Sequence, residues 1–110
     1  QLSEKEATIE KAKAELIKDF HRSLTIKDLS KLVGLNEHNL KTGFKEIYGK
    51  PIHTYLKDYK LNKARELIIS GDAQINEIAY AIGYTNVSHF IEAFKKKFGM
   101  TPKKFEMSLS

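Results

Sequence analysis

The sequence contains two copies of one pattern, and this internal repeat is the feature that most restricts the possible fold. Segment 26–49 aligns with segment 75–99, and the first parts of the two copies lie 49 residues apart, which pairs Gly34 with Gly83. Beyond the turn the separation becomes 50, because the second copy has one additional residue there. Two copies are too few for a solenoid, which needs about three or more repeats. The repeat therefore predicts a duplicated supersecondary unit.

Each copy has the parts of a helix-turn-helix motif. A short apolar-faced helix carries a small residue at its fifth position, Ser30 or Ala79, where the next helix can cross closely. A glycine-containing turn and a longer helix follow in both copies. A single copy would fit any two helices joined by glycine, but two copies in register favour the specific motif.

Apolar residues recur at helical spacing along the rest of the chain, and no segment alternates as a strand would. We expect an all-α fold with seven helices, which form two helix-turn-helix subdomains joined by a long linker helix. The expected parts are an N-terminal helix on the first subdomain (1–24), the first helix-turn-helix (25–50), the linker helix (51–71), and the second helix-turn-helix with a C-terminal helix (72–110).

Several residues mark expected helix ends and buried faces. Thr25 and Asp28 have the spacing of a capping box. Gln74 stands where the second copy needs a cap, although glutamine is a poor one. Several apolar positions are predicted to be buried: Ile26, Leu29, Leu32 and Val33 in the first short helix, Ile47 in the next, and Leu67 in the linker.

Charge favours a polyanionic partner. The net charge is +5, and residues 1–24 carry five basic and five acidic groups, so the surplus lies downstream. No apolar run approaches the roughly 18 residues of a membrane span, so we expect no membrane partner. The chain begins at Gln1 rather than Met, which we interpret as a domain of a longer protein.

Both halves resemble the C-terminal DNA-binding domain of the AraC/XylS family of bacterial transcription regulators. The resemblance is carried by INEIAYAIGY from residue 75, by AFKKKFGMTPKKF from residue 93, and by the linker-like YLKDYKLNKARELI from residue 55. It implies sequence-specific binding to double-stranded operator or promoter DNA that regulates transcription, usually by activation. It also implies RNA polymerase as a partner, an effector-binding or dimerisation domain before Gln1, and a cytoplasmic, nucleoid-associated location.

The resemblance further implies two recognition helices in successive major grooves on one face of the DNA. The expected linker helix of about 19 residues is about 28 Å long at 1.5 Å per residue. Successive major-groove segments on one face of B-DNA lie roughly 34 Å apart, which is comparable.

In the first recognition helix, residues opposite the apolar side are expected to face DNA. The N-terminal part of such a helix meets base edges, and its far end lies near the backbone. We therefore assign Lys45 to phosphate and four residues to bases: His38, Asn39, Lys41 and Thr42.

The second recognition helix presents a different stripe. Its expected base contacts are Val87, Ser88, His89, Ile91 and Glu92. Its expected phosphate contacts, including the basic segment that follows, are Asn86, Lys95, Lys96, Lys103 and Lys104. Glu92 departs from the family, in which a basic or polar residue is common at this position. Either Glu92 accepts from a cytosine amino group, or the second motif binds weakly through phosphates and DNA bending.

Other classes of function have less support. The four histidines lack metal-ligand spacing, and no nucleophile elbow or phosphate loop is present, so we expect no enzyme, metal or cofactor. RNA binding lacks an RRM signature or a GXXG loop. The main alternative is a helical protein-interaction module with non-specific DNA affinity.

Overall fold

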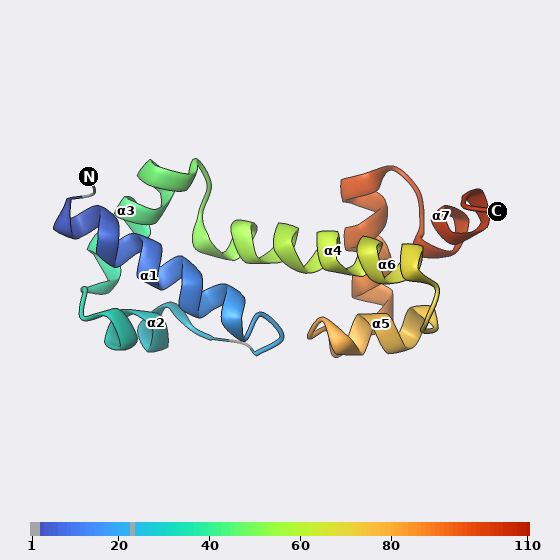
Figure 1. The fold of residues 1–110 in the computed structure, drawn as a ribbon, viewed down its shortest axis with the longest axis horizontal. Helices are drawn as coiled ribbons and strands as arrows, with labels where there is room; N and C mark the ends of the chain where they lie inside the picture. The colour runs from blue at the N-terminus through green and yellow to red at the C-terminus, as the bar shows by residue number, and fades with distance from the viewer. Residues whose placement is uncertain (1–2, 23) are drawn as a thin grey trace. The chain divides into compact units, whose positions relative to one another are not determined.

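The computed structural model describes residues 3–22 and 24–110, which form seven helices and no strand (Figure 1). The predicted all-α fold with seven helices is therefore confirmed. The helices are α1 (Glu4–Lys18), α2 (Ile26–Val33), α3 (Glu37–Tyr48), α4 (Ile52–Ser70), α5 (Ile75–Ala81), α6 (Val87–Phe98) and α7 (Pro102–Ser108).

Internal contacts divide the chain into two compact units, residues 1–57 and 58–110. The division falls within α4, so this helix contributes its first residues to unit 1 and the remainder to unit 2. Unit 1 contains the α2–α3 motif and unit 2 contains the α5–α6 motif.

In unit 1, α1 packs against both helices of the first motif. The packing depends on Gly43, which is buried in the middle of α3. A Cβ atom on Gly43 would lie 2.9 Å from Cδ1 of Ile9, so the missing side chain allows α1 to approach closely. The buried core of this unit consists of Ile9, Ala12, Leu16, Leu29, Leu40, Phe44 and Ile52.

In unit 2, aromatic rings provide most of the bulk around α6. The Phe94 ring centroid lies 4.6 Å from that of Phe98 and 5.8 Å from that of Phe105 on α7. The Arg65 guanidinium lies 4.8 Å from the Phe98 centroid, at a distance typical of a cation–π contact. The other buried hydrophobic residues of this unit are Leu61, Ala64, Ile68, Ile78, Ala79, Ile82 and Phe90.

The predicted capping box is present at the start of α2. The Thr25 hydroxyl oxygen accepts from the Asp28 N–H at 3.0 Å, and the Thr25 N–H donates to the Asp28 carboxylate at 3.3 Å. Hydrogen bonds from Thr25, first through its side chain and then its backbone, lower the pKa of Asp28.

The helix start at Gln74 is satisfied in another way. The Gln74 N–H donates to the Glu77 carboxylate at 2.9 Å, while the Glu77 N–H donates to the Asn76 side chain at 3.0 Å. The Asn76 side chain therefore accepts the bond that a better capping residue at position 74 would accept.

Three apolar positions predicted to be buried are exposed: Leu32 by 52%, Ile47 by 40% and Leu67 by 38%. In each case the apolar face of the helix is wider than the part of it that neighbouring helices cover. On α2, for example, Leu29 is 1% exposed whereas Leu32 is left open. Helical periodicity locates an apolar face but does not determine how much of it is covered.

Candidate nucleic-acid interface

The two motifs share the geometry of their turns. In the first, the Leu35 N–H donates to the Ser30 carbonyl at 3.2 Å. In the second, the Tyr84 N–H donates to the Ala79 carbonyl at 2.9 Å. Leu35 and Tyr84 are 49 residues apart, as are Ser30 and Ala79, so the repeat in the sequence is also a repeat in hydrogen bonding.

Both longer helices begin at asparagine caps and end at glycines. The Asn36 side chain accepts from the Asn39 N–H at 2.8 Å, and the Asn86 side chain accepts from the His89 N–H at 3.1 Å. Each helix terminates at a glycine with positive φ, which is 80° at Gly49. The caps fix the first turn of each helix, which is the part that meets base edges in this type of motif.

The outer face of α3 brings together all five site residues predicted for the first motif. Leu40 and Phe44 are fully buried, which turns the intervening positions outward. Among the described residues, neither Lys41 nor Lys45 forms an ion pair, so both ammonium groups are available to an anion. The exposed site residues on this face are His38, Asn39, Lys41, Thr42 and Lys45.

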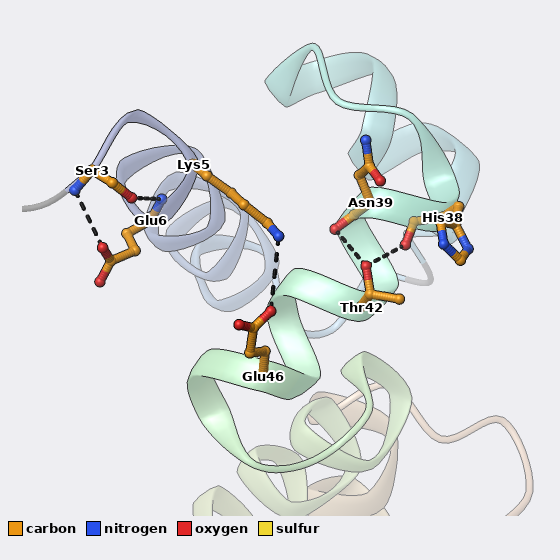
Figure 2. A network of polar contacts seen from close by, with 7 residues as sticks. All are labelled: Ser3, Lys5, Glu6, His38, Asn39, Thr42 and Glu46. Carbon is orange, nitrogen blue, oxygen red and sulfur yellow. Dashed lines mark hydrogen bonds and ion pairs between the residues drawn. The ribbon is translucent and has the colours of Figure 1, made fainter.

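The Thr42 hydroxyl is committed to its own helix. It donates to the carbonyl oxygen of His38 at 2.9 Å, and the carbonyl of Asn39 lies 3.4 Å away (Figure 2). Because this donor is already used, the side chain offers a ligand its methyl group and the acceptor capacity of its hydroxyl oxygen.

The corresponding face of α6 is more apolar and carries an acid. Val87 and Ile91 are half-buried, so their side chains offer only part of their surface. The remaining site residues predicted on this helix are exposed: Ser88, His89, Glu92, Lys95 and Lys96. Asn86 is exposed as well, although its side-chain oxygen is occupied by the cap.

The lysines near the C-terminus differ in how free their charges are. Lys97 forms an ion pair with Asp58 at 3.3 Å, with both side chains 27% exposed, so it belongs to the packing of unit 2. Lys103 pairs with Glu106 at 3.2 Å. Lys104 is exposed and forms no ion pair in the described part of the chain.

A groove of about 530 Å³ runs beside α3 within unit 1. Lys41, Thr42 and Lys45 of α3 line it, and so does His53 of α4. Sequence reasoning did not assign His53 to the site, because no motif connects it with the recognition helix.

Residues 3–22 and 24–110 contain no group of three or more histidine, cysteine or acidic side chains arranged to hold a metal ion. In the same residues, no helix is both long enough and apolar enough to cross a membrane.

Comparison with known proteins supports a common origin for this arrangement. The sequence profile of a helix-turn-helix domain family matches residues 29–108. The xylose operon regulatory protein of Escherichia coli K12 is 42% identical over 73 residues, which make up 66% of this chain and 19% of that protein. The transcriptional activator FapR of E. coli is 33% identical over 94 residues, 86% of this chain and 36% of FapR.

A relative with two activities is also similar. AdaA of Bacillus subtilis, a bifunctional transcriptional activator and DNA repair enzyme, is 31% identical over 88 residues, 80% of this chain and 42% of AdaA. This chain therefore spans about a fifth of the length of the xylose operon regulator and less than half of the other two relatives.

Solved structures share the fold. The C-terminal domain of AraT, a response regulator from Geobacillus stearothermophilus, matches with a TM-score of 0.88 and 26% identity over 96% of this chain and 88% of that domain. The DNA-binding domain of AdpA, solved with a target DNA, matches with a TM-score of 0.86 over 92% of this chain and 91% of that one. Its sequence identity is 15%, so this match supports a shared fold and nothing more. The chain belongs to the AraC/XylS family of helix-turn-helix transcription regulators, as a DNA-binding domain.

Proposed function

We propose that this domain binds a bipartite site in double-stranded DNA and thereby regulates transcription, usually as an activator. The observation that carries the proposal is the open face of α3, where five polar side chains are exposed on a helix with a capped first turn. Its two lysines form no ion pair among the described residues, so both positive charges are available to an anion. A face of this kind matches the polar edges and phosphates of a major groove.

On α3, we assign His38, Asn39, Lys41 and Thr42 to base edges. Lysine donates to the O6 and N7 acceptors of guanine, which makes Lys41 the main source of base preference. The Thr42 methyl, left outward by the bonds of its hydroxyl, fits the methyl group of thymine. Lys45, one turn further along, contacts phosphate.

On α6, we assign the base-reading role to Val87, Ser88, His89, Ile91 and Glu92. Ile91 is suited to a thymine methyl, and the Glu92 carboxylate is suited to the amino group of cytosine. We assign phosphate contacts to Asn86, Lys95, Lys96, Lys103 and Lys104. Of the lysines, we expect Lys103 to contribute least, because its charge is already paired with Glu106.

The two recognition helices are proposed to enter successive major-groove segments. The 19 residues of α4 give a helix about 28 Å long, which is comparable with the spacing of about 34 Å between such segments. One chain would then read two boxes without a second copy, and its site need not be palindromic.

The full protein is proposed to be larger than this domain. The curated relatives extend well beyond the matched region, which supports an effector-binding or dimerisation domain before Gln1. RNA polymerase is the expected partner for activation. We expect this domain to work in the cytoplasm at the nucleoid, because its proposed ligand is chromosomal DNA, and we expect no catalysis from it.

The first experiment is selection of bound sequences from a pool of random duplexes, followed by affinity measurements across salt. We expect two short boxes about one helical turn apart. Lys41→Ala should weaken binding by about 1–3 kcal/mol and relax base preference in one box only. Lys11→Ala, which removes an exposed lysine from α1, is the matched control and should leave both boxes unchanged.

Two outcomes would decide against this function. Selection that enriches no sequence, with binding lost at physiological salt, would indicate an interaction module with incidental charge. Relaxation of both boxes by Lys41→Ala would contradict the separate roles of α3 and α6.

If phosphates dominate, the logarithm of the affinity should fall by about 0.9 per phosphate contact for each log unit of salt.

A further inference from the structure

The groove beside α3 has a chemistry that the proposed base contacts do not explain. Its apolar surface comes from Ile26 at the start of α2 and from Pro51 and Ile52 at the start of α4. Polar side chains on its lining come from α3, and one more comes from α4, namely His53. None of the described residues that line the groove is acidic.

This lining restricts the occupant to an anion with apolar parts. Lys41 and Lys45 supply full positive charges, and His53 supplies an exposed imidazole N–H donor. A DNA strand has the matching chemistry, because its phosphates are anionic and its deoxyribose rings present carbon-bound hydrogens between them. A protein segment would have to be acidic and apolar in the same short stretch to fit equally well.

The position of the groove favours the same occupant. Lys41 and Thr42 belong both to the groove and to the base-reading face of α3, while Lys45 belongs to the groove and to the proposed phosphate contacts. A strand whose bases meet Lys41 and Thr42 would therefore continue into the groove with its backbone. The three groove elements all lie within unit 1, so this arrangement needs no contribution from unit 2.

We infer that this groove seats the backbone of one DNA strand at the first box, and that His53 of α4 donates to a phosphate there. The inference rests on the proposed function and adds a contact from outside the helix-turn-helix motif. Pro51, which is half-buried, would pack against the sugar next to that phosphate. His53 would thus fix the register of α3 on the strand without itself reading a base.

The test is a chemical double-mutant cycle on the duplex selected above. Single phosphates flanking each of the two boxes are replaced, one at a time, by neutral methylphosphonates, and affinity is measured for the unmodified protein and for His53→Ala. We expect one position where the replacement weakens the unmodified protein about 5- to 10-fold but the variant less than about 2-fold, as for a lost hydrogen bond to a charged group. His21→Ala removes an exposed histidine of the same unit that lies outside the groove, and it should retain the full loss at that position.

Each outcome has a separate meaning. If every methylphosphonate affects His53→Ala and the unmodified protein equally, His53 does not touch the backbone and the inference is wrong, although the proposed function stands. If the sensitive phosphate lies beside the second box, the groove is not at the first box and the inference is again wrong. If no duplex is selected at all, the proposed function fails and the inference fails with it. Circular dichroism melting of the variants identifies any loss of folding.

Discussion

The recognition helices α3 and α6 begin and end alike but differ on the faces that they present. Both have an asparagine cap and a terminal glycine in the left-handed region. On the outer stripe of α3, Lys41 and Lys45 form no ion pair among the described residues. On the matching stripe of α6, Lys95 corresponds to Lys45, but Ile91 and Glu92 stand at the positions of Lys41 and Thr42. The scaffold was therefore kept in both copies while the surface chemistry changed.

The packing against the buried faces of α3 and α6 differs as well. Position 43 of α3 corresponds to position 93 of α6, and it is a buried glycine in the first helix but a half-buried alanine in the second. Gly43 is required to be small because Ile9 of α1 lies against it. In α6 the neighbouring Phe94 instead packs on Phe105 of α7. The second helix of each motif therefore packs against a different additional helix, α3 against α1 and α6 against α7.

The largest expected effect comes from adding the same side chain at these matched positions. Gly43→Val should cost about 2–3 kcal/mol, because the new atoms overlap Ile9 in a filled core. Ala93→Val should cost less than about 1 kcal/mol, mainly through helix propensity. Urea unfolding measures the cost, and amide hydrogen exchange assigns it to α3 or to α6. Equal costs would show that the close approach of α1 does not constrain α3.

The next effect concerns the acid on α6. Glu92→Gln should shift the preferred base in the second box from cytosine towards adenine, because glutamine pairs with adenine N6 and N7, and the change should be about 1–3 kcal/mol at that base pair. Repeating the duplex selection with this variant measures the shift. Glu66→Gln makes the same charge change on an exposed site of α4 and should leave the preference unaltered. Uniformly tighter binding without a new preference would mean that Glu92 only repels phosphate.

The smallest effect comes from exchanging the caps of α2 and α5. Gln74→Thr should stabilise α5 by about 0.5–1 kcal/mol, and Thr25→Gln should destabilise α2 by about 1 kcal/mol, because only threonine accepts from the third N–H of the helix. Thermal unfolding and hydrogen exchange of the two short helices measure both changes. No gain from Gln74→Thr would mean that the bond between Asn76 and Glu77 already satisfies that end.

The same cap should respond to acid. The pKa of Asp28 is lowered in the folded chain, so its carboxylate stabilises the fold above the unfolded-state pKa and loses this contribution as the pH falls through the folded value. The stability difference between the unmodified protein and Asp28→Asn should therefore shrink below about pH 4. A constant difference between pH 6 and pH 2 would contradict a role for the charged form.

Local signals in the sequence predicted most of the fold. The capping box of Thr25 and Asp28 was predicted because its two hydrogen bonds join residues only three positions apart, so a short segment of sequence contains both partners. The exposure of the α3 stripe followed in the same way from the burial of Leu40 and Phe44. These features depend on spacing, which a sequence displays directly.

Features that depend on contacts between distant segments were not predictable in this way. Leu32 resembles a core residue by period alone, and only the arrangement of its neighbours leaves it 52% exposed. His53 reaches the groove because the start of α4 lies beside α3, which no local pattern encodes. Gly43 likewise lies in no turn that would require glycine. Glycine is needed there because the side chain of Ile9, 34 positions earlier in the chain, lies against it.

The packing of α1 also bears on solubility. The family profile begins at residue 29, yet Ile9, Ala12 and Leu16 of α1 form part of the core around Phe44. A fragment cut at the start of that match would uncover the apolar sides of α2 and α3, and exposed apolar surface of this kind promotes aggregation. The shortest well-behaved form of this domain therefore extends beyond the segment that the family profile matches, and it includes the whole of α1.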